Sequence, residues 1–229
     1  ELVKQKGVSL AKYFNSTAEH LEKLQADTNY KINLVVEEIN SLAAQIQQLN
    51  RQIYYYELDG SNANDLRDRR TLLVDQLSRL VNIEANEVVT GKLPDGRDEK
   101  HFVIVISGKA LVDHFNVSKL AVEQRETKLN PEEDIPGLYE VKWADGNELV
   151  VKGGELKGYL DMRDGNEGQN GSPIYKGIPY YIKKLNQFVR TFAKAFNEGI
   201  IDLDGDGVID DGSGHADGYR LDSAEGDGP

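Results

Sequence analysis

The residues best placed to do chemistry are the carboxylates of the stretch DLDGDGVIDD, at residues 202–211. Aspartates that alternate and run into a glycine match the first part of an EF-hand loop, because carboxylates converge this closely only when a cation offsets their repulsion. The candidate calcium ligands are Asp202, Asp204, Asp206, the carbonyl group of Val208, and Asp210. The match ends at Ser213, which stands where the loop uses a bidentate glutamate. Two interpretations stay open: a weak structural Ca²⁺ site that braces a loop at the base of the last helix, or an acidic, solvated turn.

No other set of residues points to catalysis or to a cofactor. The sequence has no cysteine, which removes disulfides, thiolate nucleophiles and zinc sites built on sulfur. The histidines are scattered and lack metal-binding spacing: they are His20, His101, His114 and His215. No nucleophile elbow, phosphate-binding glycine loop or dinucleotide fingerprint occurs. We therefore expect a protein that is not an enzyme, requires no cofactor and takes no small-molecule substrate.

Composition and charge narrow the class of partner. The chain has 229 residues, 39% of them hydrophobic and 29% charged, which is typical of folded globular protein. The net charge of −12 argues against nucleic acid and against an anionic membrane surface, since both attract clustered Lys and Arg. No apolar run is long enough to span a bilayer, and the first ten residues lack the apolar core of a cleaved signal peptide. Export by a route that removes no leader remains compatible with this sequence.

The elements that must carry any function begin with a long helix. Residues 9–56 contain neither proline nor glycine, and one series of apolar residues alternates gaps of three and four: Ile32, Val35, Ile39, Leu42, Ile46, Leu49 and Ile53. At 39% hydrophobic content, such a series arises by chance about once in a thousand registers. A strict repeat of this kind predicts the packing seam of a coiled coil. The same register places Gln25 and Thr28 on the seam, where the helix is expected to be solvated or broken.

The segments after the long helix include both predicted helices and predicted strands. A second amphipathic helix is expected over 64–83, and a short one between the glycines at 153–165. Residues 84–91, 101–115, 138–145 and 147–154 are predicted strands, and the nearly continuous apolar run 101–107 reads as a central strand covered on both faces. The last helix, from residue 178, repeats the heptad path and is the expected partner of the first: its seam residues are Ile182, Leu185, Val189, Phe192 and Phe196.

These elements predict an α+β fold, in which a long antiparallel helical bundle or coiled-coil rod carries an inserted, small antiparallel β domain at one end. The rod domain is discontinuous and comprises residues 1–83 and 153–200. The inserted β-rich domain comprises residues 84–152. Residues 201–229 form an acidic loop rich in Gly and Asp, or the start of a further domain.

Four stretches resemble one known family. The first, "LAKYFNSTAEHLEKLQADTNYKINLVVEEINSLAAQIQQLNRQI", is similar to the long N-terminal helical segment of the flagellar hook-associated protein 1 family. "NDLRDRRTLLVDQLSRLVNI" is similar to the signature N-D-L-x-D-x-R-D-x-L-x-x-x-L-S of the flagellar hook-associated protein 1 family, with Arg70-Thr71 in place of the usual R-D pair. "GGELKGYLDMRD" resembles that family's G-G-x-L-x-G-L-L-x-x-R-D, and "IPYYIKKLNQFVRTFAKAFNEG" resembles its helix that ends in F-N. The resemblance covers about 1–83 and 153–207, in the family's order.

The resemblance implies a structural subunit that joins the hook of the bacterial flagellum to its filament. It implies packing against copies of itself, the hook protein and other junction or filament proteins, an export chaperone before secretion, and a location outside the cell. The family's interlocking terminal segments are missing, so a middle portion of a longer protein is expected. The alternative is a calcium-dependent extracellular adhesion or recognition module, motivated by residues 202–210 and the β domain.

Overall fold

The computed structural model describes residues 2–58, 60–93, 96–198, 200–201 and 210–211. The chain forms two compact units, of which unit 1 comprises Glu1–Leu21 with Tyr180–Pro229 and unit 2 comprises Glu22–Pro179. The first helix, α1 (Leu2–Leu58), contributes residues to both units. Its 57 residues are helical without interruption, as the absence of proline and of interior turn signals predicts.

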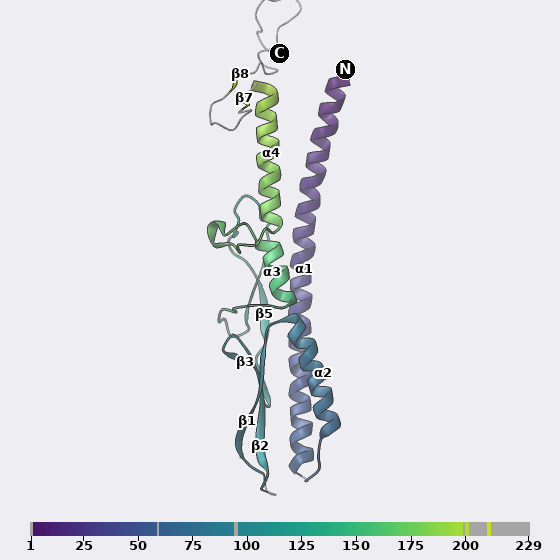
Figure 1. The fold of residues 1–229 in the computed structure, drawn as a ribbon, viewed down its shortest axis with the longest axis vertical. Helices are drawn as coiled ribbons and strands as arrows, with labels where there is room; N and C mark the ends of the chain where they lie inside the picture. The colour runs from purple at the N-terminus through teal and green to yellow at the C-terminus, as the bar shows by residue number, and fades with distance from the viewer. Residues whose placement is uncertain (1, 59, 94–95, 199, 202–209, 212–229) are drawn as a thin grey trace, which may run out of the picture. The chain divides into compact units, whose positions relative to one another are not determined.

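Unit 2 contains the second part of α1 and two shorter helices. Figure 1 shows α2 (Asn64–Leu80) running back alongside α1. Asp65 in its first turn and Arg79 in its last complement the helix dipole. Next comes α3 (Glu155–Asp164), which begins after Gly154. Gly154 has φ +89°, and a Cβ there would lie 2.7 Å from the carbonyl oxygen of Leu80, so only glycine fits where α3 approaches the end of α2.

The strands of unit 2 form two antiparallel sheets. In the larger sheet the order is β1 (Glu84–Lys92), β2 (Asp98–Ile106), β3 (Lys109–Asp113) and β4 (Asn116–Val117). The smaller sheet pairs β5 (Leu120–Gln124) with β6 (Tyr139–Trp143). A single 3₁₀ turn, η1 (Gln169–Gly171), follows α3. The strand predicted over 147–154 is not formed; that segment makes one isolated bridge, between Lys142 and Glu148.

The core of unit 2 lies between α1 and the strands. One cluster of buried side chains joins the apolar face of α1 to residues of α2, α3, β2, β3, β5 and β6. The strands therefore run along the second part of α1. The sheet, too, has an apolar face, and α1 offers a long apolar surface against which to bury it.

Unit 1 pairs the first part of α1 with α4 (Ile178–Glu198), and Figure 1 shows these two segments running antiparallel. Phe14 packs edge-on against Phe188 and Phe192, with ring centroids 5.7 and 6.5 Å apart. Beyond α4, β7 (Ile200–Ile201) pairs with β8 (Asp210–Asp211). A long helix combined with small antiparallel sheets confirms the predicted α+β class.

Candidate functional site

The packing seam proposed for α1 is buried throughout unit 2. Its seven side chains are at most 7% exposed: Ile32, Val35, Ile39, Leu42, Ile46, Leu49 and Ile53. Residues three and four apart lie on one face of a helix, so the heptad spacing gathers them in one stripe. Burial of each such side chain stabilises the fold by about 1.5–3 kcal/mol.

The partner of this seam differs from the sequence-based expectation. The core that contains it includes Leu77 and Leu80 of α2, Ile104 of β2 and Leu156 of α3, but no described residue of α4. Apolar periodicity shows that a face is buried without specifying what covers it. Elements that follow one another through short connections usually pack together, and α2 and the strands follow α1 in this way.

The seam residues proposed for α4 are less buried. Ile182 is 7% exposed, and Leu185 and Val189 are half-buried. Phe192 and Phe196 are 41% and 51% exposed. An open apolar groove of about 600 Å³ in unit 1 is lined by Leu10 and Phe14 of α1 and by four side chains of α4: Val189, Phe192, Ala193 and Phe196.

The polar seam residues Gln25 and Thr28 are neither solvated nor at a break in the helix. At Gln25 and Thr28 the helix is continuous, and the side chains are 0% and 3% exposed. The amide nitrogen of Gln25 donates to Asp134 Oδ1 and to the carbonyl oxygen of Arg163, both at 3.1 Å, and its oxygen accepts the Ile135 N–H at 3.0 Å. The expectation of a solvated or broken helix was wrong because distant segments supply these hydrogen bonds.

Gln25 belongs to a row of amide side chains that continues beside the seam. Asn29 accepts the N–H of Tyr139, and Asn40 both donates to the carbonyl of Leu120 at 2.8 Å and accepts its N–H at 2.9 Å. Further along, Gln47 donates to the carbonyl of Phe115 and Asn50 to that of His114. We call this set the amide row: Gln25, Asn29, Asn40, Gln47 and Asn50. It binds α1 to backbone groups of the strands and loops that cover it.

Near Gln25 lies a charged group that sequence reasoning missed. Arg163, at the end of α3, is 0% exposed. Its guanidinium donates to both carboxylate oxygens of Asp164, at 2.9 and 2.7 Å, and to Asn29 Oδ1 at 2.8 Å. Arg125 adds a second bidentate pair to Asp164, at 3.0 and 2.6 Å. Two adjacent residues, R-D, gave no sign in the sequence that they would form a buried pair.

The pKa of Asp164 depends on two opposing effects, burial of the carboxylate and its contacts with the arginines. Burial alone would raise it, but hydrogen bonds and charge from Arg163 and Arg125 outweigh burial and hold the pKa below its ordinary value. Asp164 is therefore ionised at neutral pH and accepts from two guanidinium groups. The arrangement holds α3, the 125–137 loop and α1 together.

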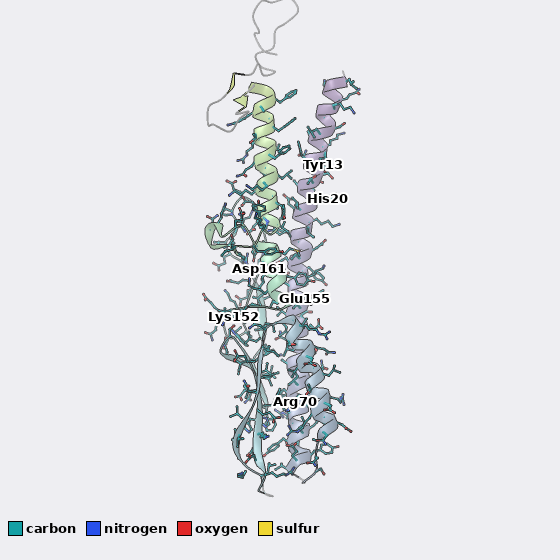
Figure 2. The ribbon with its side chains drawn as sticks, viewed as in Figure 1. Tyr13, His20, Arg70, Lys152, Glu155 and Asp161 are labelled. Carbon is teal, nitrogen blue, oxygen red and sulfur yellow. The ribbon has the colours of Figure 1, made fainter. Side chains whose placement is uncertain are left out.

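A second buried arginine connects α2 with α1 and β1. Arg70, labelled in Figure 2, donates to Asn50 Oδ1 at 3.0 Å and to Glu87 at 2.7 Å. Its guanidinium also lies 3.8 Å from the ring centre of Phe102. Burial lowers the pKa of Arg70. Burial also acts to raise the pKa of Glu87, but the hydrogen bond from Arg70 and the charge of neighbouring Arg67 lower it overall.

The candidate calcium ligands fall mostly outside the described residues: Asp202, Asp204, Asp206 and Val208 lie there, and only the backbone of Asp210 is described, paired with Ile201. Within the described ranges, no group of three or more His, Asp or Glu side chains could hold a metal ion. The structure does bring together two histidines that look unrelated in sequence, since the rings of His101 and His114 stack 3.9 Å apart. In the described part of the chain, no helix is long and apolar enough to cross a membrane.

Comparison with known proteins gives a consistent match. A model of the flagellar hook-associated protein FlgK helical domain matches residues 1–206. The chain is 30% identical over 217 residues to flagellar hook-associated protein 1 of Bacillus subtilis, which covers 86% of this chain and 39% of that protein. It is 27% identical over 201 residues to the Escherichia coli protein of the same name, covering 84% and 32% respectively. The chain thus spans well under half the length of these relatives.

A solved structure resembles the fold. It is the flagellar hook junction protein FlgK from Burkholderia pseudomallei, with a TM-score of 0.52 and 23% identity over 71% of this chain and 29% of that one. At this identity the likeness concerns the fold alone.

Proposed function

The chain belongs to the family of the flagellar hook-associated protein FlgK helical domain, and from this premise we propose that it acts as a structural part of the junction between hook and filament. The family match over residues 1–206 carries the proposal. In this role the protein is not catalytic and needs no cofactor, and it works by packing against neighbouring subunits.

The mechanical character of α1 supports this role. A subunit that joins two assemblies has to keep its shape under load, and a helix bends least where its side chains are packed and its register is fixed. The buried seam provides the packing, and the amide row provides register through hydrogen bonds to defined backbone groups. We propose that the discontinuous helical part, residues 1–83 and 153–200, bears the load, and that residues 84–152 brace it along one side.

The partners and the location follow from the same premise. The proposed partners are further copies of the protein, the hook protein, other junction or filament proteins, and a chaperone before export. The proposed location is the extracellular flagellum, reached without a cleaved signal peptide. The net charge of −12 suits an exposed outer surface, because like-charged subunits remain soluble before assembly. We do not propose the calcium-dependent adhesion module: no observation on the described residues favours it, and its candidate ligands Asp202, Asp204 and Asp206 lie outside them.

Complementation tests the proposal. The full-length parent protein is expressed in a strain that lacks its own hook-associated protein 1, and attached filaments are counted by electron microscopy. We expect the parent to restore attachment and the variant Ile39→Asp to fail, because the substitution places a charge at a position with 0% exposure. Leu34→Asp is the matched control on the same helix, at 43% exposure, and should restore attachment. Failure of the unaltered parent to restore filaments, despite its export, would refute the role.

A further inference from the structure

His114 lies at the point where the larger sheet meets α1. It follows β3 in a backbone conformation with φ +50°, which is uncommon outside glycine. Its N–H donates to the carbonyl oxygen of Phe102 in β2 at 3.0 Å, and its own carbonyl accepts from Asn50 of α1 at 2.9 Å. One residue therefore connects the turn between β3 and β4 to both β2 and α1.

The imidazole of His114 is held in a place that disfavours its charged form. The residue is 6% exposed, and neither ring nitrogen has a hydrogen-bond partner. The ring stacks on His101 with ring centroids 3.9 Å apart. The ring of Phe115 lies tilted by 32° with its centroid 3.8 Å away, and the ring of Tyr54 in α1 meets it edge-on with centroids 5.9 Å apart. A protonated imidazole carries two N–H donors, and this setting leaves both without acceptors.

Charged groups of both signs surround the ring, and their effects on the pKa of His114 partly cancel. Asp113 adjoins it on β3, and on β2 His101 lies with its Nε2 3.5 Å from Glu99. Arg70 faces it from α2, held by Glu87 of β1. A small pocket beside the ring is also lined by the charged side chains of Glu57, Arg67 and Lys100.

Burial and the charge of His101 lower the pKa of His114 to about 4, and Arg70 acts in the same direction, while Glu99 and Asp113 counteract only part of this.

We propose that His114 is an acid-sensitive clamp, whose protonation releases the β3–β4 turn from α1 while the rest of unit 2 stays folded. The folded state favours the neutral ring and the opened state allows protonation near the ordinary pKa of 6.5. The stabilisation is complete above pH 6.5 and is lost as the pH falls from there toward 4. Between pH 7 and pH 5 the equilibrium constant for opening rises about twenty-fold. This proposal is independent of the flagellar role.

Amide hydrogen exchange under rapid-reclosing conditions tests the clamp. The protection factor of the His114 amide is expected to fall about twenty-fold from pH 7 to pH 5. The Arg125 amide, bonded to the carbonyl of Leu138 at 2.8 Å just beyond the end of the smaller sheet, is the internal reference and should keep its protection. In His114→Asn, whose side chain tolerates positive φ and does not titrate, the fall should disappear. An equal fall at both amides, no fall at His114, or the same fall in the variant overturns the proposal.

A direct titration of the ring keeps the test independent of any variant. Nitrogen-15 NMR of the unaltered chain should show the His114 imidazole neutral at pH 5 and protonating close to pH 4. Protonation near pH 6.5 in the folded chain would show that the ring is not held in its neutral form, and it would refute the clamp.

Discussion

Replacing Arg163 with methionine should strongly destabilise unit 2. Arg163 is fully buried and makes three side-chain hydrogen bonds, two to Asp164 and one to Asn29. Methionine fills much of the same volume but leaves a carboxylate that is 5% exposed with fewer partners. Removing one member of a buried ion pair costs about 3–5 kcal/mol. Because Arg125 still donates to both oxygens of Asp164, and Asn29 still accepts from Tyr139, we expect the lower end, about 3 kcal/mol.

Urea denaturation of the wild type, Arg163→Met, Asp164→Asn and the double variant gives a double-mutant cycle. If the penalty arises from the uncompensated carboxylate, Asp164→Asn should recover part of it in the Arg163→Met background, with a coupling energy of about 1–3 kcal/mol. Arg125→Met is the matched control, since its side chain is 18% exposed and water can replace it in part. The reasoning is refuted if Arg163→Met costs under about 1 kcal/mol, or if the two substitutions add without coupling.

The remaining predictions concern the seam, two glycines and acid stability. Ile39→Ala should lower the free energy of unfolding by about 2–5 kcal/mol, whereas Leu34→Ala, on the exposed side of α1, should change it by less than about 0.5 kcal/mol in the same urea titration. Gly165→Ala should cost at least about 1–3 kcal/mol, because the new Cβ would lie 2.4 Å from the carbonyl oxygen of Tyr175. Gly158→Ala, inside α3 with no atom near the new Cβ, should instead raise the melting temperature through about 0.5–1 kcal/mol of helix propensity. Since the pKa of Asp164 is lowered on folding, its contribution is present above about pH 4 and is lost below it, so Asp164→Asn should flatten the loss of stability there.

The long helix and its buried face could be predicted because they depend on local information. Seven apolar residues in strict register identify a stripe, and the lack of proline and glycine between residues 9 and 56 allows one uninterrupted helix. What covers that stripe depends on which apolar surface arrives there. The last helix and the surface formed by α2 and the sheet both have an apolar face that could cover the stripe. The spacing of apolar residues does not distinguish between these two partners.

The polar contacts could not be predicted, for a related reason. Gln25 and Thr28 are unfavourable seam residues until a segment more than 100 residues away supplies partners, as Asp134 does for Gln25. Likewise Arg163 and Asp164 are ordinary surface types until α3 and the 125–137 loop enclose them. Prediction from sequence assumes that each polar residue has the exposure typical of its type. Residues of a buried hydrogen-bonded network depart from that assumption.

The strand errors have their own physical cause. The run 101–107 is nearly continuous in apolar residues, which predicted cover on both faces, yet within it Ile104 and Ile106 are fully buried while Val103 and Val105 are only half-buried. The second face is therefore only half-covered, and an apolar run in the sequence does not distinguish half cover from full cover. The strand β5 was missed because its sequence, LAVEQ, is too short to show a period.

The amide row explains how α1 can be both apolar enough to pack and specific enough to hold one register. A stripe of Ile, Val and Leu with a seven-residue repeat would accept its neighbours almost equally well after a slip of one heptad, because each repeat presents the same kind of surface. Asn40 opposes such a slip, since it binds both the N–H and the carbonyl of Leu120 and a shift of one heptad would break both hydrogen bonds. Asn50 and Gln25 act likewise at either side of it, on His114 and on the 134–135 backbone region. The seam therefore supplies most of the stabilisation, and a few amides decide which arrangement is stabilised. Stability from apolar packing and register from amide hydrogen bonds together suit a helix whose proposed role requires rigidity.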